Sequence, residues 1–343
     1  MKIVVVGSQG TLGSELVRNW NSPKVDARIA DNLGRAFDAS QDEIVPLNLP
    51  DFDICSRLIV VDTMAELAPD VIVNAAGVNL VDWLESRPNT ARNLHEHGVA
   101  NLREAARRSH ATLVQFSCAE VFYRSRLEEN APDACERAET PEDARRRARP
   151  FASEEDAPIA RDASGFDEFV VPNPASVYAK TKLESERVAS EAPNSLVLRF
   201  SSVFGETSQY SSGNLVASLL NGVCRTKKLF ALNDRLVEPI WALDLLCALK
   251  TLLRVDARGL FHLTGNSRAT PLEVGEFLLK QTGLRGREIV GISSEEYGDK
   301  APRSAFTILS STRAAELDAI YRIPDWKTSL NDYFDWRDCL NGL

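Results

Sequence analysis

Short apolar runs alternate with amphipathic stretches along most of the chain. Residues 2–6 form a β-branched run, and residues 11–20, beyond a glycine-rich turn, carry apolar side chains at helical spacing. The first pattern predicts a strand and the second predicts a helix. The further predicted strands are 27–30, 43–47, 71–74, 112–117 and 195–200, and the further predicted helices cover about 52–67, 89–109, 175–190 and 271–283. Strands that alternate with helices form parallel sheets covered on both faces, so we expect an α/β fold with a doubly wound, Rossmann-type sheet.

One charged stretch, residues 124–170, breaks this alternation and is too long for an ordinary connection. Within it, Thr140 followed by Pro141 and two acidic residues has the sequence of a helix start. Four arginines follow where the C-terminal end of a short helix favours cations, at Arg145, Arg146, Arg147 and Arg149. The favoured interpretation is a solvated insertion, and the alternative is a lid whose arginines contact a diphosphate.

The sequence GSQGTLG places Gly7, Gly10 and Gly13 between the first predicted strand and the first predicted helix. In this context the first glycine permits a tight turn, the second lets the backbone approach a pyrophosphate, and the third allows close packing of helix and sheet. The amino terminus of the helix then offers amide donors and a positive dipole to an anion. Because the glycines have the strand, turn and helix that the motif requires, they predict a dinucleotide site.

Two further segments are candidates for cofactor contacts. Asp31 follows the predicted strand 27–30, where a carboxylate would accept hydrogen bonds from the adenosine ribose and repel a 2′-phosphate. This favours NAD(H), while the nearby Arg35 leaves NADP(H) open; the alternative for Asp31 is a surface turn. The segment VNAAG (73–77) ends another predicted strand with small residues beside Asn74, which let backbone run beneath a flat cofactor or simply pack closely.

Tyr178 and Lys182 are the candidates for proton transfer. They occur in SVYAKTK, within a helix predicted to begin after Pro174, and their i, i+4 spacing places both side chains on one helix face. A lysine ammonium near a phenol stabilises the phenolate and lowers the pKa of the phenol. The tyrosine can then exchange a proton with a substrate oxygen whose carbon gains or loses hydride.

The composition limits the possible partners. A hydrophobic fraction of 44% excludes a mainly disordered chain, and a net charge of −9 argues against nucleic acid. The six cysteines are scattered without a CxxC pair, which favours reduced thiols in a cytoplasmic protein and predicts neither a disulfide framework nor a metal site. No stretch approaches about 18 apolar residues, so we expect a soluble protein with no membrane contact.

The C-terminal third has a different sequence pattern, with the segment GLFHLTG (259–265), a predicted helix near 271–283 and a Trp-rich end. We expect residues 1–205 with about 238–254 to form the dinucleotide-binding domain, including the insertion at about 124–170. About 206–237 and 255–343 are then expected to form a smaller α/β substrate-binding lobe.

Several motifs together resemble the extended short-chain dehydrogenases/reductases, and within them most closely the branch of the dTDP-4-dehydrorhamnose reductases. They are GSQGTLGSELV, DVIVNAAGVNLVDWLE, GVANLREAA, SVYAKTK, LRFSSVFG, GNLVASLL, PIWALDL and GLFHLTG. The match covers nearly the whole chain. The resemblance implies a nicotinamide cofactor, a nucleotide-sugar substrate and a homodimer built on the helices that flank Tyr178.

The resemblance also implies roles for particular residues, with Tyr178 as proton donor and Lys182 on the nicotinamide ribose. The implied cofactor-binding residues are Gly7, Gln9, Gly10, Thr11, Leu12, Gly13, Asp31, Asn32, Asn48, Leu49, Asn74, Ala75, Ala76, Ser117, Tyr178, Lys182, Ser201 and Val203. The implied substrate contacts are Val81, Cys118, Tyr178 and Asn214, and Cys118 and Glu120 join Tyr178 and Lys182 as catalytic candidates.

Cys118 stands where this superfamily usually has a serine or threonine beside the substrate oxygen. A thiol is a weaker hydrogen-bond donor than a hydroxyl, which would slow an enzyme without abolishing its activity. Ser117 is not expected to replace it, because neighbouring strand residues face opposite sides. The alternative for Cys118 is a small buried filler. His95 in place of asparagine and Ser202 in place of a bulky aromatic are further departures that predict a remodelled substrate pocket.

These residues are compatible with three functions. The first is an NAD(P)H-dependent reductase of a keto-sugar nucleotide. The second is a sugar-nucleotide epimerase or decarboxylase that retains NAD, because Glu120 stands where such enzymes of the superfamily have a base; Ala119 removes the paired acid that dehydration would need. The third is a non-catalytic, nucleotide-binding regulatory subunit.

Overall fold

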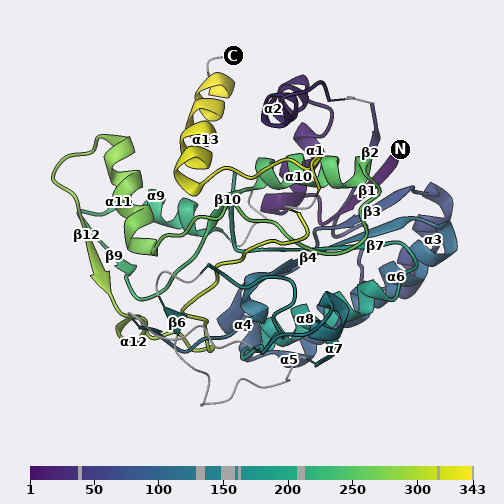
Figure 1. Cartoon of the computed structure of the whole chain (residues 1–343), viewed down its shortest axis with the longest axis horizontal. Helices are drawn as coiled ribbons and strands as arrows, with labels where there is room; N and C mark the ends of the chain where they lie inside the picture. The colour runs from purple at the N-terminus through teal and green to yellow at the C-terminus, as the bar shows by residue number, and fades with distance from the viewer. Residues whose placement is uncertain are drawn as a thin grey trace.

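The computed structural model of the chain describes residues 1–37, 41–128, 136–147, 159–160, 164–206, 213–314 and 317–341. Its main element is a six-stranded sheet in the order β11-β7-β4-β3-β1-β2, in which every neighbouring pair is parallel. The strands are β1 (Lys2–Val6), β2 (Glu43–Leu47), β3 (Val71–Asn74), β4 (Thr112–Cys118), β7 (Ser195–Phe200) and β11 (Gly259–His262). The expected parallel α/β sheet is therefore confirmed (Figure 1).

Helices cover both faces of the sheet because alternate strand residues are apolar on each face. Ile3 and Val5 lie in one hydrophobic core, whereas Val4 and Val6 lie in another. The helices on the first face are α1 (Thr11–Asn19), α2 (Pro23–Leu33) and α10 (Ala242–Arg254), and those on the second are α3 (Arg57–Leu67), α6 (Gly98–Ser109) and α8 (Val177–Ser190) (Figure 1). Among the described residues, no helix is both long and apolar enough to cross a lipid bilayer.

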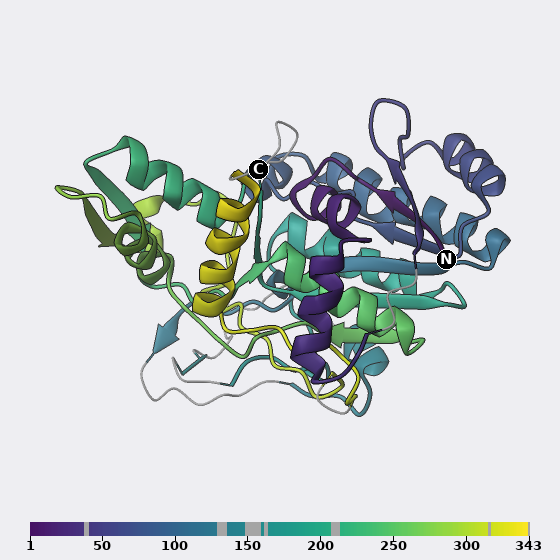
Figure 2. The same ribbon diagram turned by 90° about the horizontal axis from the view of Figure 1, so that it is seen from above.

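A smaller group of elements lies at one end of the molecule (Figures 1 and 2). It contains the parallel strand pair β9 (Lys228–Leu232) and β12 (Glu288–Ile292), with helices α9 (Leu215–Arg225), α11 (Pro271–Thr282) and α12 (Ser294–Tyr297). β11 pairs with β7 in the main sheet, so it does not lie in the smaller lobe where we expected it. The other domain boundaries stay a prediction.

The remaining elements are short apart from the last helix, and most of them border the sheet ends. They are α4 (Val81–Glu85), α5 (Pro88–Arg92), a π-helical turn (Asn93–His97), a 3₁₀ turn (Ala119–Val121), β5 (Leu127–Glu128), α7 (Pro141–Arg147), β6 (Ile159–Ala160), β8 (Ser202–Phe204), β10 (Pro239–Trp241) and α13 (Trp326–Asn341). The π-helical turn joins α5 to α6, so the single helix predicted over 89–109 is continuous but contains a local widening.

The predicted strand 27–30 is wrong, because these residues lie inside helix α2. Pro23 occupies the first turn, and Gly34 ends the helix in the left-handed conformation, with φ of 63°. Val25 and Ile29 are fully buried and stand four residues apart, which is the spacing of a helix face. The proline and glycine that bracket this segment were the signals that should have outweighed its short, partly apolar stretch.

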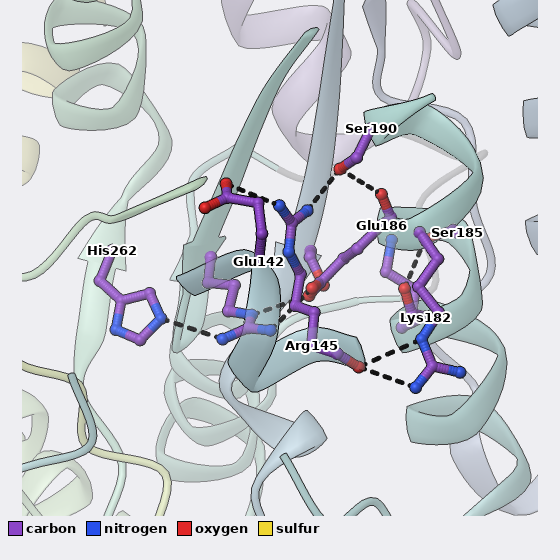
Figure 3. A network of polar contacts seen from close by, with 10 residues as sticks. Glu142, Arg145, Lys182, Ser185, Glu186, Ser190 and His262 are labelled. Carbon is purple, nitrogen blue, oxygen red and sulfur yellow. Dashed lines mark hydrogen bonds and ion pairs between the residues drawn. The ribbon is translucent and has the colours of Figure 1, made fainter. Parts of the chain in front are cut away.

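Helix α7 confirms the helix start predicted at Thr140, whose hydroxyl accepts a hydrogen bond from the amide of Asp143 at 3.0 Å. Arg145 is buried against α8 and donates hydrogen bonds to Ser190 and to Glu142. Figure 3 shows Arg145 facing α8, so it is not a lid residue that contacts a diphosphate. The side chains of Arg146 and Arg147, and all of Arg149, lie outside the described residues.

A buried ion pair holds α8 against the sheet. Both oxygens of Glu186 on α8 accept hydrogen bonds from Arg199 on β7, at 2.8 and 2.7 Å, and neither residue is exposed to solvent. The hydroxyl of Ser117 on β4 also donates to Glu186, at 2.5 Å. Burial disfavours the carboxylate, but Arg199 and these hydrogen bonds outweigh it and hold the pKa of Glu186 below its ordinary value. One carboxylate therefore ties α8 to two adjacent strands.

We expect Arg199→Met to lower the free energy of unfolding by about 3–5 kcal/mol, because it leaves the carboxylate of Glu186 buried without its partner. Urea unfolding measures the change. Arg57→Met, which breaks the exposed ion pair with Glu104, is the matched control and should cause no comparable loss. Equal unfolding midpoints for Arg199→Met and the unmodified protein would show that the ion pair does not hold the helix in place.

Candidate active site

A cleft of about 870 Å³ opens at the carboxyl ends of the sheet strands, between the sheet and the smaller lobe. Ligands of open α/β sheets bind at this edge, because the loops that follow the strands meet there. Many of the predicted site residues line the cleft: Gly10, Thr11, Leu12, Asn74, Ala75, Ala76, Val81, Ser117, Cys118, Glu120, Tyr178, Lys182, Ser201, Val203 and Asn214. The sheet thus brings together segments that are far apart in the sequence.

The three glycines of the first turn have different physical requirements. Gly7 has a φ of 77°, and a Cβ there would lie 2.5 Å from the amide nitrogen of Ala76. A Cβ on Gly13 would lie 2.1 Å from the carbonyl oxygen of Gly7. A Cβ on Gly10 would meet only that same oxygen, at 3.5 Å. Packing within the protein therefore requires glycine at positions 7 and 13, whereas Gly10 keeps space free at the cleft and at the start of α1.

Asp31 does not lie at the expected ribose position. Because residues 23–33 form α2, its carboxylate lies on that helix and borders a shallow hollow with Arg28 and Tyr321, away from the cleft. Asn32 is also on α2, and its side-chain amide donates to the carbonyl of Arg322 at 2.9 Å. Neither Asp31 nor Asn32 therefore lies where the predicted contact with the cofactor ribose would require it.

The second strand of the sheet is instead β2, which ends beside the glycine turn. The carbonyl of Leu47 accepts hydrogen bonds from the amides of Gly7 and Ser8, at 2.9 and 3.2 Å. Asn48 follows immediately, and its side-chain amide donates to Gln9 at 2.9 Å. Asn48 and Gln9 therefore meet at the glycine turn, in the place where the second strand ends. Leu49 is exposed there.

Tyr178 and Lys182 both face the cleft from α8. The helix begins at a well-defined place, because Ser176 accepts the amide of Ala179 at 3.1 Å and Glu85 accepts the amide of Val177 at 2.8 Å. The ammonium of Lys182 donates to the carbonyl of Phe116, at the end of β4, at 2.6 Å. Burial raises the pKa of Tyr178 well above its ordinary value and lowers the pKa of Lys182. The phenol therefore keeps its proton.

Cys118 lies next to the phenol, at the end of β4. Its thiol and the hydroxyl of Tyr178 are hydrogen-bonded, while the hydroxyl of Ser117 donates to Glu186, about two turns further along α8. Ser117 therefore does not take the place of Cys118 beside Tyr178. Burial raises the pKa of Cys118 to about 11, so the group beside Tyr178 is a neutral thiol rather than a thiolate.

Asn74, Asn214 and Ser201 shape the cleft through bonds within the protein. The carbonyl oxygen of the Asn74 side chain accepts the amide of Ala76 at 3.2 Å, which fixes the turn after β3. The side chain of Asn214 caps α9, with its oxygen 2.8 Å from the amide of Ala217. The hydroxyl of Ser201 lies 3.3 Å from that of Thr307.

Two arginines of the smaller lobe face Glu120 across the cleft, and sequence reasoning missed both. Arg235 donates to Asp299 at 2.7 Å, and Arg303 is 3.4 Å from Asp82. Within the described part of the chain, the Nε atom of each arginine is buried without a hydrogen-bond partner. Burial raises the pKa of Glu120 even though both arginines oppose this. No sequence spacing connects positions 235 and 303, so only the fold reveals this pair.

His95, which the sequence marked only as a departure from the family pattern, also lines the cleft. It is 3% exposed and comes from the π-helical turn, a feature that often marks functional sites. Its ring meets the ring of Tyr178 edge-on, with centroids 5.8 Å apart, and its Nδ1 atom is 2.9 Å from the hydroxyl of Thr181. Burial, assisted by Lys182, lowers the pKa of His95 to about 3, so the imidazole is neutral.

A parallel sheet with a glycine-rich first turn, and a Tyr–Lys pair on the helix before β7, defines the class of extended short-chain dehydrogenases/reductases. The chain matches the family described as RmlD substrate binding domain over residues 1–132 and 158–338, and it belongs to this family. The predicted resemblance is thereby confirmed.

Named relatives and solved structures agree with this assignment. A dTDP-4-dehydrorhamnose reductase of Sinorhizobium fredii is 30% identical, over 84% of this chain and 87% of its own length. A solved dTDP-4-dehydrorhamnose reductase of Clostridium acetobutylicum has the same fold, with a TM-score of 0.77, 23% identity and coverage of 98% of this chain and 100% of its own. The Bacillus anthracis dTDP-4-dehydrorhamnose reductase, solved with NADP, gives a TM-score of 0.75 at 19% identity, over 97% of this chain and 99% of its own.

The buried, neutral His95 predicts a loss of stability in acid. Below about pH 6.5 the unfolded chain binds a proton at this residue and the folded chain does not, so stability falls as the pH drops. Between pH 7.5 and pH 5, we expect the unmodified protein to lose about 2 kcal/mol more unfolding free energy than His95→Gln. Urea unfolding at the two pH values measures this difference.

The exposed His97, on the same turn, is the control for this experiment. His97→Gln should follow the unmodified protein at both pH values. If His95→Gln loses as much stability in acid as the unmodified protein, then His95 is protonated in the folded state and the assignment of a neutral imidazole fails.

Proposed function

We propose that the protein is an NAD(P)H-dependent reductase of a keto-sugar nucleotide that acts as dTDP-4-dehydrorhamnose reductases do. The observation that carries this proposal is the placement of Tyr178 and Lys182 in one cleft with the glycine turn. The cofactor supplies hydride when bound. Gly10, Thr11 and Leu12 would hold it at one end of the cleft, and the backbone at Ala75 and Ala76 would lie along it.

Tyr178 supplies the proton in this proposal. Because burial keeps the phenol protonated, it can donate to a carbonyl oxygen as that oxygen gains negative charge. Lys182 stands one helical turn away and is fixed by the carbonyl of Phe116, so its ammonium can stabilise the phenolate that remains. Cys118 adds a weak hydrogen bond to the phenol where the superfamily usually has a hydroxyl.

The cofactor preference is the finer part of the proposal. The preference for NAD(H) predicted from Asp31 loses its basis, since Asp31 lies on α2. At the end of β2 stands the neutral amide of Asn48, which can bond a ribose hydroxyl but does not repel a 2′-phosphate as a carboxylate would. We therefore propose that the site accepts both NADH and NADPH. Similar folds have been solved with NADP and with NAD.

A nucleotide sugar fits the opposite end of the cleft. Its diphosphate is doubly charged, and guanidinium groups recognise phosphate oxygens through charge-assisted hydrogen bonds. Arg235 and Arg303 face the cleft with unpaired Nε atoms among the described residues, which supports a diphosphate near them. The sugar would then lie between this pair and Tyr178, beside Val81.

The other functions considered from the sequence receive less support. The relatives include several reductases of dTDP-4-dehydrorhamnose. The acid near Glu120 is Asp299, and it is held in an ion pair with Arg235. We include a homodimer built on α6 and α8, which pack together, as part of the proposal. It is supported by the resemblance to related dehydrogenases.

The test is the oxidation of NADPH and of NADH, followed by absorbance, with dTDP-4-dehydrorhamnose as substrate. We expect turnover by the unmodified protein and a loss of kcat of about 10²- to 10⁴-fold in Tyr178→Phe, because the variant lacks the proton donor. The circular dichroism spectrum and the urea unfolding midpoint should stay nearly unchanged and serve as the control for folding. Equal turnover in Tyr178→Phe, or no turnover with either cofactor in the unmodified protein, would contradict the proposal.

Cys118→Ser tests whether the thiol limits the rate. A hydroxyl donates a stronger hydrogen bond toward the developing charge, so we expect kcat to stay equal or to rise by up to roughly tenfold. Cys55→Ser, at a partly exposed cysteine outside the cleft, is the matched control and should not change kcat. Complete loss of activity in Cys118→Ser would show that the sulfur itself is essential and would overturn this role.

A further inference from the structure

The Nε2 atom of His95 has no hydrogen-bond partner among the described residues, although the side chain is almost fully buried. A buried polar atom without a partner is costly, and native structures rarely keep one that nothing satisfies. His95 also lines the cleft, next to Gly77, where a Cβ would come within 3.8 Å of Nε2. The unsatisfied atom therefore lies at the place where a ligand would bind.

The hydrogen bonds around the ring determine which nitrogen carries the proton. The hydroxyl of Thr181 donates its single proton to the carbonyl of Tyr178, at 3.1 Å. With that proton engaged, we assign Thr181 as the acceptor in its 2.9 Å contact with His95, which places the proton of the neutral imidazole on Nδ1. Nε2 is left with a free lone pair, and it is an acceptor rather than a donor.

The surroundings of His95 hold this acceptor in a fixed position. The ring is braced edge-on by Tyr178 and bonded through Nδ1 to α8, the helix that carries both Tyr178 and Lys182. The nearby ammonium of Lys182 also opposes protonation of the ring. An uncharged, immobile acceptor beside the phenol suits a neutral donor such as a hydroxyl group.

We infer that Nε2 of His95 accepts a hydrogen bond from a hydroxyl group of the molecule bound beside Tyr178, and that His95 is a positioning residue of this site. The hydroxyl belongs either to the ribose of the nicotinamide nucleotide or to the sugar of the substrate. The inference rests on the proposed function, because both molecules are those of the proposed reaction. It assigns to His95 a role that depends on its tautomer, which Thr181 sets.

Nitrogen NMR of the unmodified protein, labelled with ¹⁵N-histidine, tests the inference without any change in the site. His95 is identified as the signal that is missing from His95→Gln. We expect the free protein to show a protonated Nδ1 and an unprotonated Nε2 at this residue. Addition of NADPH alone should shift the Nε2 signal if the donor is the ribose, whereas a shift only after addition of a dTDP-sugar would assign the donor to the substrate.

Two substitutions provide an independent readout. His95→Phe keeps a ring against Tyr178 but removes the acceptor, and we expect the dissociation constant of the molecule that donates to rise by about 5- to 30-fold in calorimetry. His95→Gln places an amide oxygen near the position of Nε2 and should restore most of the affinity. His97→Phe makes the same change on the exposed side of the turn, and it should bind both molecules as the unmodified protein does.

The outcomes separate this inference from the proposed function. Binding of NADPH and a dTDP-sugar with an unchanged Nε2 signal, or a protonated Nε2 in the free protein, overturns the role of His95 alone. Unchanged affinities for both molecules in His95→Phe have the same meaning. If the unmodified protein binds neither molecule, the proposed function fails, and the inference fails with it.

Discussion

The attachment of α8 to strands β4 and β7 is the constraint on which the site depends. α8 carries both Tyr178 and Lys182, and the cleft is formed only if this helix lies at the correct height along the strands. The buried pair of Glu186 and Arg199 anchors the helix to β7, and one turn earlier the bond from Lys182 to the carbonyl of Phe116 anchors it to β4. Two charges taken out of water are costly, but once paired they tolerate little displacement. This pair therefore sets the position of the helix more than it adds stability.

Burial also determines the chemical state of the groups in the cleft. Tyr178, Cys118 and His95 are all held neutral, because none of them can be charged there at a low cost. The positive charges come from Lys182 and, at the far end, from arginines of the smaller lobe. A cleft with a protonated phenol and surrounding cations is suited to a reaction in which negative charge develops on a substrate oxygen.

The smaller lobe completes the site with residues that no local pattern connects. Arg235 and Arg303 come from segments almost seventy positions apart, as the numbering shows, and they meet because the lobe folds over the carboxyl ends of the strands. Their acidic partners, Asp299 and Asp82, belong to the lobe and to α4 respectively. The position of the lobe against the sheet is therefore part of the binding site.

The sequence by itself was sufficient to predict the parallel sheet, the glycine turn and the placement of Tyr178 and Lys182 on one helix face. These features rest on short-range periodicity and spacing, which the backbone geometry of strands and helices determines directly. It was also sufficient to predict that Cys118, and not Ser117, is the residue beside Tyr178, because neighbouring strand residues alternate in direction. Residues 27–30 of α2 were predicted as a strand, since so short a stretch suits either structure and the flanking proline and glycine were not weighed.

Only the tertiary structure decided the rest of the site. Asp31 does not lie at the cofactor position, because the second strand of the sheet begins at residue 43 and not at residue 27. Which segment becomes that strand depends on pairing between distant parts of the chain. The acceptor on His95 exists because Thr181, from another helix, takes up the other ring nitrogen. Tautomers, buried partners and pKa shifts arise from contacts across the fold, and a linear pattern carries no information about which distant atoms will meet.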